Sequence, residues 1–66
     1  MTLTVNGKPL DVGQKLNAAE LIWQLGYQNQ RIALEVNEVI IAKSQHSEFA
    51  LSAGDKVEII KAVGGG

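Results

Sequence analysis

The sequence has no cysteine, one histidine and one proline in 66 residues. Without cysteine it can form no disulfide and offer a metal no thiolate, and one histidine cannot make a zinc site alone. No apolar run approaches the roughly 20 residues that span a membrane. Six basic and seven acidic side chains give a net charge of −1, which gives no electrostatic basis for binding nucleic acid. We expect a small cytoplasmic protein, because the first residues also lack the pattern of a secretory signal.

Alternating polarity at the start of the chain predicts a β-hairpin. Apolar and polar residues alternate over 2–5, a period of two that is typical of a half-buried strand. Asn6 and Gly7 follow directly, and both tolerate the positive φ angles of a type I′ turn. Residues 8–12 return as a second strand. Pro9 has no N–H, which places that strand at an edge of the sheet.

Several signals agree on one helix. Asn17 is an N-cap candidate, and Glu20 three positions later completes a capping-box pattern. Leu16 is placed to form a hydrophobic staple with the first turn, and Gly26 ends the helix as a C′ glycine. The apolar residues are spaced at i, i+3, i+4 and i+7, which makes one stripe. This stripe consists of Ala18, Leu21, Ile22 and Leu25.

The second half of the chain predicts three more strands and one helical turn. The strands are expected over residues 31–36, 39–42 and 56–63, with the helical turn within 43–48. The helix has the only full apolar stripe, so it should cover one face of a mixed sheet. A right-handed crossover then places the last strand parallel to the first. This order predicts an α+β fold, the ubiquitin-like β-grasp, with four or five strands and one main helix.

The chain ends in Gly64, Gly65 and Gly66, a run that average glycine usage would produce by chance in about 0.03% of cases. Such an end can be a frayed segment without function. Alternatively, it is narrow enough to enter the channel of another protein, because glycine has no Cβ. We therefore predict a domain over 1–63 and a flexible access arm over 64–66. A partner enzyme using ATP could convert the Gly66 carboxylate to an acyl-adenylate, and a sulfur nucleophile could then leave a thiocarboxylate there.

Nearly the whole chain resembles the ThiS family, the sulfur carriers of thiamine biosynthesis. The matching stretches are VNGK at 5–8, NAAELIWQLG at 17–26, ALEVN at 33–37 and AGDKVEIIKAVGGG at 53–66. The resemblance implies a carrier that is not an enzyme and binds no cofactor, adenylated at Gly66 by an E1-like (ThiF-like) enzyme that uses ATP. The thiocarboxylate would then deliver sulfur, taken from a donor through the partner, to a ThiG-like thiazole synthase.

The chain departs from the family pattern at two places. Asn37-Glu38 stands where the family usually has Asn-Gly, which should strain that hairpin slightly. At Ala42 and His46 the family often has proline and tryptophan, so the loop over 43–48 is expected to differ in shape.

Candidate docking residues lie beside the glycine run. Ile60 and Ala62 should point to the sheet face that the helix leaves open, and with Val63 they are candidates for contact with a partner. Ala33 and Thr4 are expected to extend this patch. Apolar side chains there are informative, because the open face of such a sheet is usually wet.

Other single residues receive ordinary structural interpretations. Trp23 lies opposite the helix stripe, and we favour a shielding contact with Tyr27 over a role as a partner anchor. His46 is predicted to be a solvated loop residue, since no acid or second histidine supports it. Asp55 is expected to bond backbone N–H groups of its turn. The carboxylates are scattered, and we find neither a catalytic pair nor a metal site.

Other functions fit the same features. The chain could act as a molybdopterin-synthase small subunit, or carry sulfur for tRNA or amino acids. The molybdopterin type tends to be longer and often has proline before its glycines, unlike Ala62-Val63. From another class, it could be a β-grasp module that docks a protein or RNA and has an inert tail, although the near-neutral charge disfavours RNA. In isolation we expect a monomer.

Overall fold

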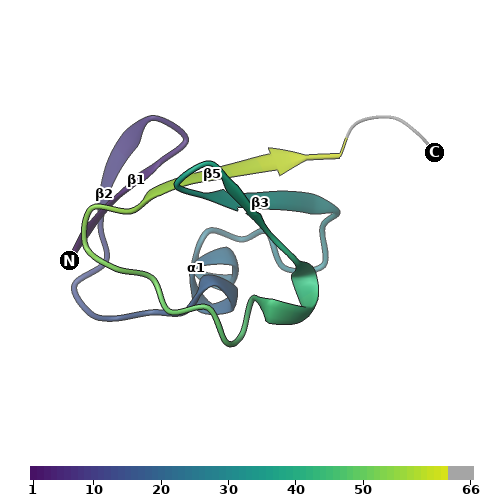
Figure 1. Ribbon diagram of the computed structural model, residues 1–66, viewed down its shortest axis with the longest axis horizontal. Coiled ribbons are helices and arrows are strands. Elements are labelled where there is room, and N and C mark those ends of the chain that lie inside the picture. The colour runs from purple at the N-terminus through teal and green to yellow at the C-terminus, as the bar shows by residue number, and fades with distance from the viewer. Residues whose placement is uncertain (63–66) are drawn as a thin grey trace.

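The computed structural model describes residues 1–62, which form five strands, one α-helix and one 3₁₀ turn (Figure 1). The elements are β1 (Thr2–Val5), β2 (Lys8–Asp11), α1 (Ala18–Gln24), β3 (Ile32–Val36), β4 (Val39–Ile41), η1 (Lys43–Gln45) and β5 (Lys56–Lys61). The predicted order is confirmed, and β2, β3 and β4 are each one residue shorter than expected. Strand β5 ends at Lys61 and does not include Ala62 as expected, while Val63 lies outside the described residues.

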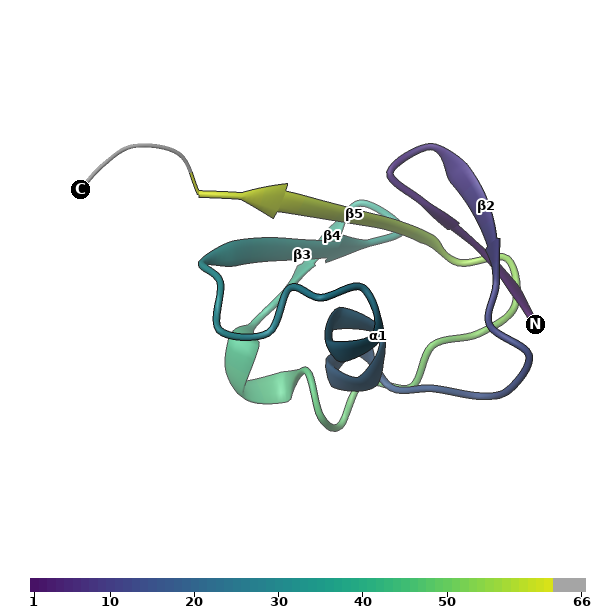
Figure 2. The same cartoon turned by 180° about the vertical axis from the view of Figure 1, so that it is seen from behind.

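The strands form one mixed sheet in the order β2-β1-β5-β3-β4. The central strand, β5, runs parallel to β1 and antiparallel to β3. Helix α1 connects β2 to β3 and lies across one side of the sheet, and no helix covers the other side within residues 1–62 (Figure 2). This is the predicted β-grasp architecture, with five strands.

The first hairpin forms as its sequence requires. Val5 pairs with Lys8, and the two residues between them have positive φ angles, 49° at Asn6 and 82° at Gly7. These angles are those of a type I′ turn, whose twist matches the twist of the flanking strands. Strand β2 lies at the sheet edge, as predicted. The lack of an N–H at Pro9 therefore costs the sheet no hydrogen bond.

Helix α1 is short, and its ends are fixed by the predicted signals. The Asn17 side chain accepts the Glu20 N–H at 2.8 Å, and the Glu20 carboxylate accepts the Asn17 N–H at 2.8 Å. The chain leaves the helix through Gly26, whose φ of 82° suits a residue without Cβ. The capping box therefore offsets the small number of hydrogen bonds that a seven-residue helix can make.

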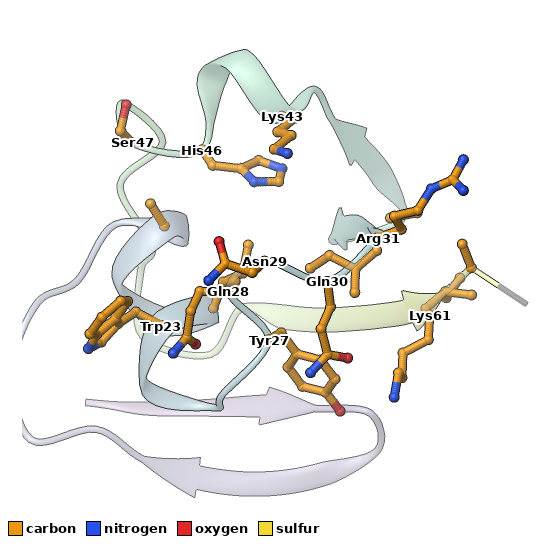
Figure 3. A pocket seen from close by; sticks show the side chains of 16 residues that line it. Trp23, Tyr27, Gln28, Asn29, Gln30, Arg31, Lys43, His46, Ser47 and Lys61 are labelled. Atoms are coloured by element: carbon orange, nitrogen blue, oxygen red, sulfur yellow. The ribbon is translucent and has the colours of Figure 1, made fainter.

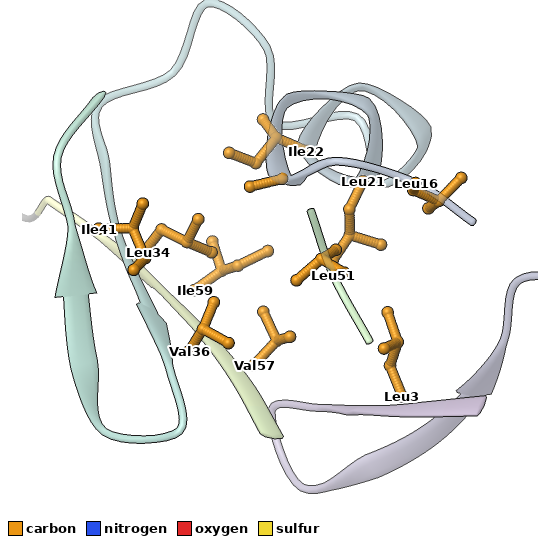
Figure 4. Packing of buried hydrophobic residues seen from close by; sticks show 11 residues of the cluster. Leu3, Leu16, Leu21, Ile22, Leu34, Val36, Ile41, Leu51, Val57 and Ile59 are labelled. Carbon is orange, nitrogen blue, oxygen red and sulfur yellow. The ribbon is translucent and has the colours of Figure 1, made fainter. Parts of the chain in front are cut away.

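The core lies between α1 and the sheet (Figure 4). Leu3, Leu21, Leu34 and Val57 are completely buried at its centre. Leu34 pairs with Ile59 across the β3–β5 ladder, so both side chains point toward the helix. The other buried apolar residues are Leu16, Ala18, Ile22, Val36, Ile41, Leu51 and Ile59. Because side chains alternate along a strand, the even-numbered residues of β5 point to the opposite, open face.

Long-range hydrogen bonds fix the turn before β5. The Asp55 carboxylate accepts the Ser52 N–H at 2.8 Å, as predicted for this turn, and also the Asn37 side-chain amide at 3.0 Å. The Asn37 side chain in turn accepts the Lys56 N–H at 3.0 Å. The β3–β4 turn is thereby tied to the start of β5.

The β3–β4 turn has the strain that the sequence suggests. Asn37 and Glu38 have φ angles of 52° and 70°. A glutamate in this left-handed region is unusual, because its Cβ crowds the following carbonyl oxygen. The prediction of a slightly strained hairpin is thus confirmed.

No helix among residues 1–62 is long and apolar enough to cross a membrane.

Candidate functional site

The end of β5 is anchored on both sides before the chain reaches the glycines. On one side the Ile59 N–H donates to the Asn6 side chain at 2.8 Å. On the other, Ile60 pairs with Ala33 and the Ala62 N–H donates to the Arg31 carbonyl at 2.8 Å. The path of the chain is therefore fixed up to Ala62. The remaining candidate residues, Val63 and the three glycines, lie outside the described part.

The predicted patch exists in part. Ile60 is 50% exposed on the open face of the sheet, opposite Ala33, and Ala62 is exposed beside them. Ile40, on the edge strand β4, adds a second large apolar side chain that is 72% exposed. Ile60, Ala33 and Ala62 present an apolar surface at the end of the strand that leads to the glycines, whereas Ile40 lies beside Glu35, two positions back along the sheet.

Thr4 does not belong to this patch, contrary to the prediction. It pairs with Lys56, four residues before Ile60 on β5, or about 13 Å along the strand. The mistake has a simple cause. Alternation identifies the face on which Thr4 lies but not its register against β5.

Two carboxylates lie between Ile40 and Ile60 on the same face. Glu35 and Glu58 are directly opposite each other in the β3–β5 ladder, a like-charge arrangement that is unfavourable. The Lys56 ammonium lies 4.0 Å from the Glu58 carboxylate and offsets part of this repulsion. The open face is thus apolar toward the end of β5 and acidic at its middle.

A pocket of about 710 Å³ opens at the end of β5 (Figure 3). Its walls are the second half of α1, the segment over 27–31, the region of η1 and the last residues of β5. Arg31, Lys43 and Lys61 line it, whereas Trp23 stands at its far side in Figure 3. This pocket was not predicted from the sequence.

The antiparallel pairing of β3 with β4 and β5 explains why cations meet at this pocket. The start of β3 lies beside the ends of both β4 and β5, because β3 is antiparallel to each of them. Arg31 precedes β3, Lys43 follows β4, and Lys61 ends β5. Three cations that are far apart in sequence are therefore brought to one end of the sheet.

His46 is buried, and the expectation of a solvated loop residue is wrong. It is only 9% exposed, and its Nε2 lies 3.0 Å from the Ile41 carbonyl oxygen. Its own carbonyl accepts the Ala19 N–H at 3.0 Å, which ties the segment after η1 to α1. The imidazole thus supports the wall of the pocket.

Trp23 is not shielded by Tyr27, contrary to the prediction. Its side chain is 66% exposed, and Figure 3 shows its ring well apart from that of Tyr27. It lines the large pocket and also a smaller hollow next to the first turn of α1. A tryptophan that stands free between two hollows is typical of a residue that anchors a partner.

No group of three or more potential metal ligands exists within residues 1–62. The carboxylates of Glu35 and Glu58 face each other, and among residues 1–62 their charged neighbour on that face is Lys56, whose ammonium lies 4.0 Å from Glu58. The side chains that meet at the end of β5 can therefore bind and position a partner.

Comparison with known proteins gives a consistent result. The ThiS family matches residues 2–66. The crystal structure of the thiamine biosynthesis protein ThiS from Geobacter metallireducens superposes with a TM-score of 0.83 and 35% sequence identity, covering 100% of both chains. A solution structure from the same organism gives a TM-score of 0.80 and covers 88% of that chain.

Two other relatives differ in length. A thiazole synthase of Paramagnetospirillum magneticum is 33% identical over all 66 residues, and the match spans only 20% of that protein. The uncharacterized protein ycf40 of Porphyra purpurea is 32% identical over 66 residues, which are 93% of its length. The chain therefore corresponds to about a fifth of one relative and to nearly all of the other.

Proposed function

The chain belongs to the ThiS family of small β-grasp sulfur carriers, and from this premise we propose that it carries sulfur for the thiazole ring of thiamine as a thiocarboxylate on Gly66. The carrier is not an enzyme. One observation supports this proposal above the others: the body that matches ThiS over its full length is followed by Gly64, Gly65 and Gly66.

The chemistry follows from the properties of a carboxylate. Its negative charge repels nucleophiles, so it must first be activated. In the proposed sequence, the Gly66 carboxylate oxygen attacks the α-phosphorus of ATP, and pyrophosphate leaves. Hydrosulfide supplied by a partner then attacks the acyl carbon of the adenylate. The carbon–sulfur bond forms, AMP leaves with the electron pair of the broken carbon–oxygen bond, and loss of the S–H proton leaves a thiocarboxylate. ATP is consumed in the active site of the activating partner.

Two protein partners are implied, an E1-like (ThiF-like) adenylating enzyme and a ThiG-like thiazole synthase. The second is supported by the relatives that are themselves thiazole synthases and contain a segment like this chain. Ile60 and Ala62 are the proposed docking residues, with Val63 continuing toward the access arm of Gly64 and Gly65. Their support is the exposed position of Ile60 and Ala62 beside the end of β5.

The intact mass of the protein tests this proposal. After incubation with ATP, an E1-like enzyme and a sulfur source, the 66-residue chain should gain the mass difference between one sulfur and one oxygen. A variant without Gly66 should gain nothing, while its far-ultraviolet circular dichroism stays that of the full chain. If the shortened chain gains the same mass, Gly66 is not the reactive position.

Growth of a deletion strain tests the pathway separately. A strain that lacks the gene should need thiazole or thiamine, and the full-length gene should restore growth without either. A strain that grows equally well without the gene would contradict the role in thiamine synthesis, even if the thiocarboxylate forms.

A further inference from the structure

Half of the basic side chains of this chain line one pocket. Three of its six basic side chains, Arg31, Lys43 and Lys61, line the pocket beside the end of β5. None of the described residues that line this pocket is acidic, although the chain has more acidic than basic side chains. The pocket therefore has a positive potential on a molecule of net charge −1, which favours an anionic occupant.

The cations surround an apolar floor and do not converge on one point. Ile22, Ile32 and Ile60 contribute apolar surface to the pocket. In Figure 3 the Lys43 side chain lies on the η1 side next to His46, whereas Arg31 and Lys61 extend outward at the opposite end. One small anion could not contact all three groups. An extended ligand with an apolar centre and several negative charges could.

One polar atom in the wall lacks a partner. Among residues 1–62, the Gln28 Oε1 atom is the buried side-chain acceptor that receives no hydrogen bond. Gln28 lines the pocket, and a rotation of its side chain toward the pocket would expose this buried oxygen to a ligand that carries N–H donors. A polypeptide backbone supplies such donors at regular intervals, whereas the phosphodiester backbone of a nucleic acid has none.

We propose that this cationic pocket, lined by Arg31, Lys43, Lys61, Trp23 and Gln28, docks an acidic segment of a protein partner. An apolar side chain of the segment lies on the floor, its carboxylates contact the rim cations, and a backbone N–H donates to Gln28 Oε1. An apolar centre with a polar rim is the usual anatomy of a protein interface, and Trp23 has the exposure of an anchor residue.

The pocket lies next to the point where the chain continues toward the glycines. The Ala62 N–H is bonded to the Arg31 carbonyl, so the last described residue lies at the pocket margin. A partner bound there lies next to the point where the chain continues toward Gly66. The pocket and the apolar part of the open face share Ile60, Ala33 and Ala62, so the two surfaces meet at the end of β5. This inference goes beyond the proposed function, since it holds whatever happens to Gly66.

Nuclear magnetic resonance with the ¹⁵N-labelled full chain tests the proposal without ATP or any enzyme. The probe is a short, capped peptide in which glutamates flank a Leu-Phe pair. It should shift the amide signals of pocket residues in a saturable way and change the Trp23 fluorescence. Salt should weaken the binding, because rim charges are screened.

Matched charge reversals identify the surface. K43E/K61E should weaken peptide binding by about tenfold. K8E/K15E makes the same change of net charge away from the pocket and should alter the affinity by less than about twofold. All four lysines are exposed, so both variants should fold, which their amide spectra will show.

Several results would overturn the proposal. One is that the amide signals of the pocket residues do not shift at the highest soluble peptide concentration. Another is that K43E/K61E and K8E/K15E lose the same affinity for the peptide. A third is that a peptide with lysines in place of the glutamates binds equally well. Stronger binding of an oligothymidylate or of inorganic phosphate in the pocket would assign it to another class of ligand. Failure of thiocarboxylate formation would leave this binding result unaffected, so the two proposals fail separately.

Discussion

The Asn6 side chain accepts the backbone N–H of Ile59 at 2.8 Å and so joins the first hairpin turn to the last strand. The same residue adopts a φ of 49° in that turn. One asparagine therefore has a local role in the hairpin and a long-range role at β5. The two roles can be separated by mutation.

Asn6→Gly keeps the turn conformation but removes the long-range hydrogen bond. We expect the free energy of unfolding to fall by about 1 kcal/mol, because the partly buried Ile59 N–H loses its partner. Urea denaturation followed by circular dichroism measures this loss. Asn29→Gly is the matched control, since Asn29 is also at positive φ (68°) and is exposed. Equal effects at both positions would show that the Asn6 side chain contributes nothing specific.

Glu38→Gly should stabilise the protein. Glu38 has a φ of 70°, in the left-handed region, where a side chain is strained. Replacing it with glycine removes this strain and should raise the free energy of unfolding by about 1 kcal/mol. The reverse change, Gly7→Glu at a φ of 82° in the other type I′ turn, should lose a similar amount. Thermal and urea unfolding of both variants measure the difference. A destabilised Glu38→Gly protein would contradict this account of the β3–β4 turn.

His46→Ala should destabilise the fold by about 2 kcal/mol. The change removes the hydrogen bond between Nε2 and the Ile41 carbonyl and leaves a cavity behind the pocket wall. Ser47→Ala, at an exposed neighbouring position, should change the stability by less than about 0.5 kcal/mol. Urea unfolding at pH 7 provides the comparison, and His46→Ala stability equal to that of the Ser47 control would show that the buried imidazole is dispensable.

Ile60→Asn should impair activation of the carrier without unfolding it. Ile60 is half exposed, and asparagine removes its apolar surface without adding a charge beside Glu58. We expect kcat/KM of the activating enzyme toward the carrier to fall about tenfold. Val39→Asn is the control, because Val39 is comparably exposed but lies on the edge strand β4. If both variants are activated normally, the proposed role of Ile60 in docking is wrong.

The features that the sequence predicts best are local ones. The Asn6-Gly7 turn and the Asn17–Glu20 capping box each depend on residues within a few positions, and both form as predicted. The α1 stripe then indicates which face is buried. Once that face is known, the remaining β-grasp topology follows from the handedness of the crossover.

The errors concern contacts between segments that are distant in sequence. The position of Thr4 depends on its register against β5, and the burial of His46 depends on how the segment after η1 packs on α1. Neither is encoded in neighbouring residues. The cationic pocket depends on three strand ends that lie side by side, and this arrangement is visible only in the assembled sheet.

The central position of β5 has a mechanical consequence. A partner that draws the end of the chain into its own catalytic channel pulls on β5 along its length. The hydrogen bonds to β1 on one side and β3 on the other then bear that load together in shear. Because β5 is not an edge strand, it cannot be peeled from the sheet one hydrogen bond at a time. The folded domain can thus be pulled by its C-terminal strand in one encounter after another without unfolding.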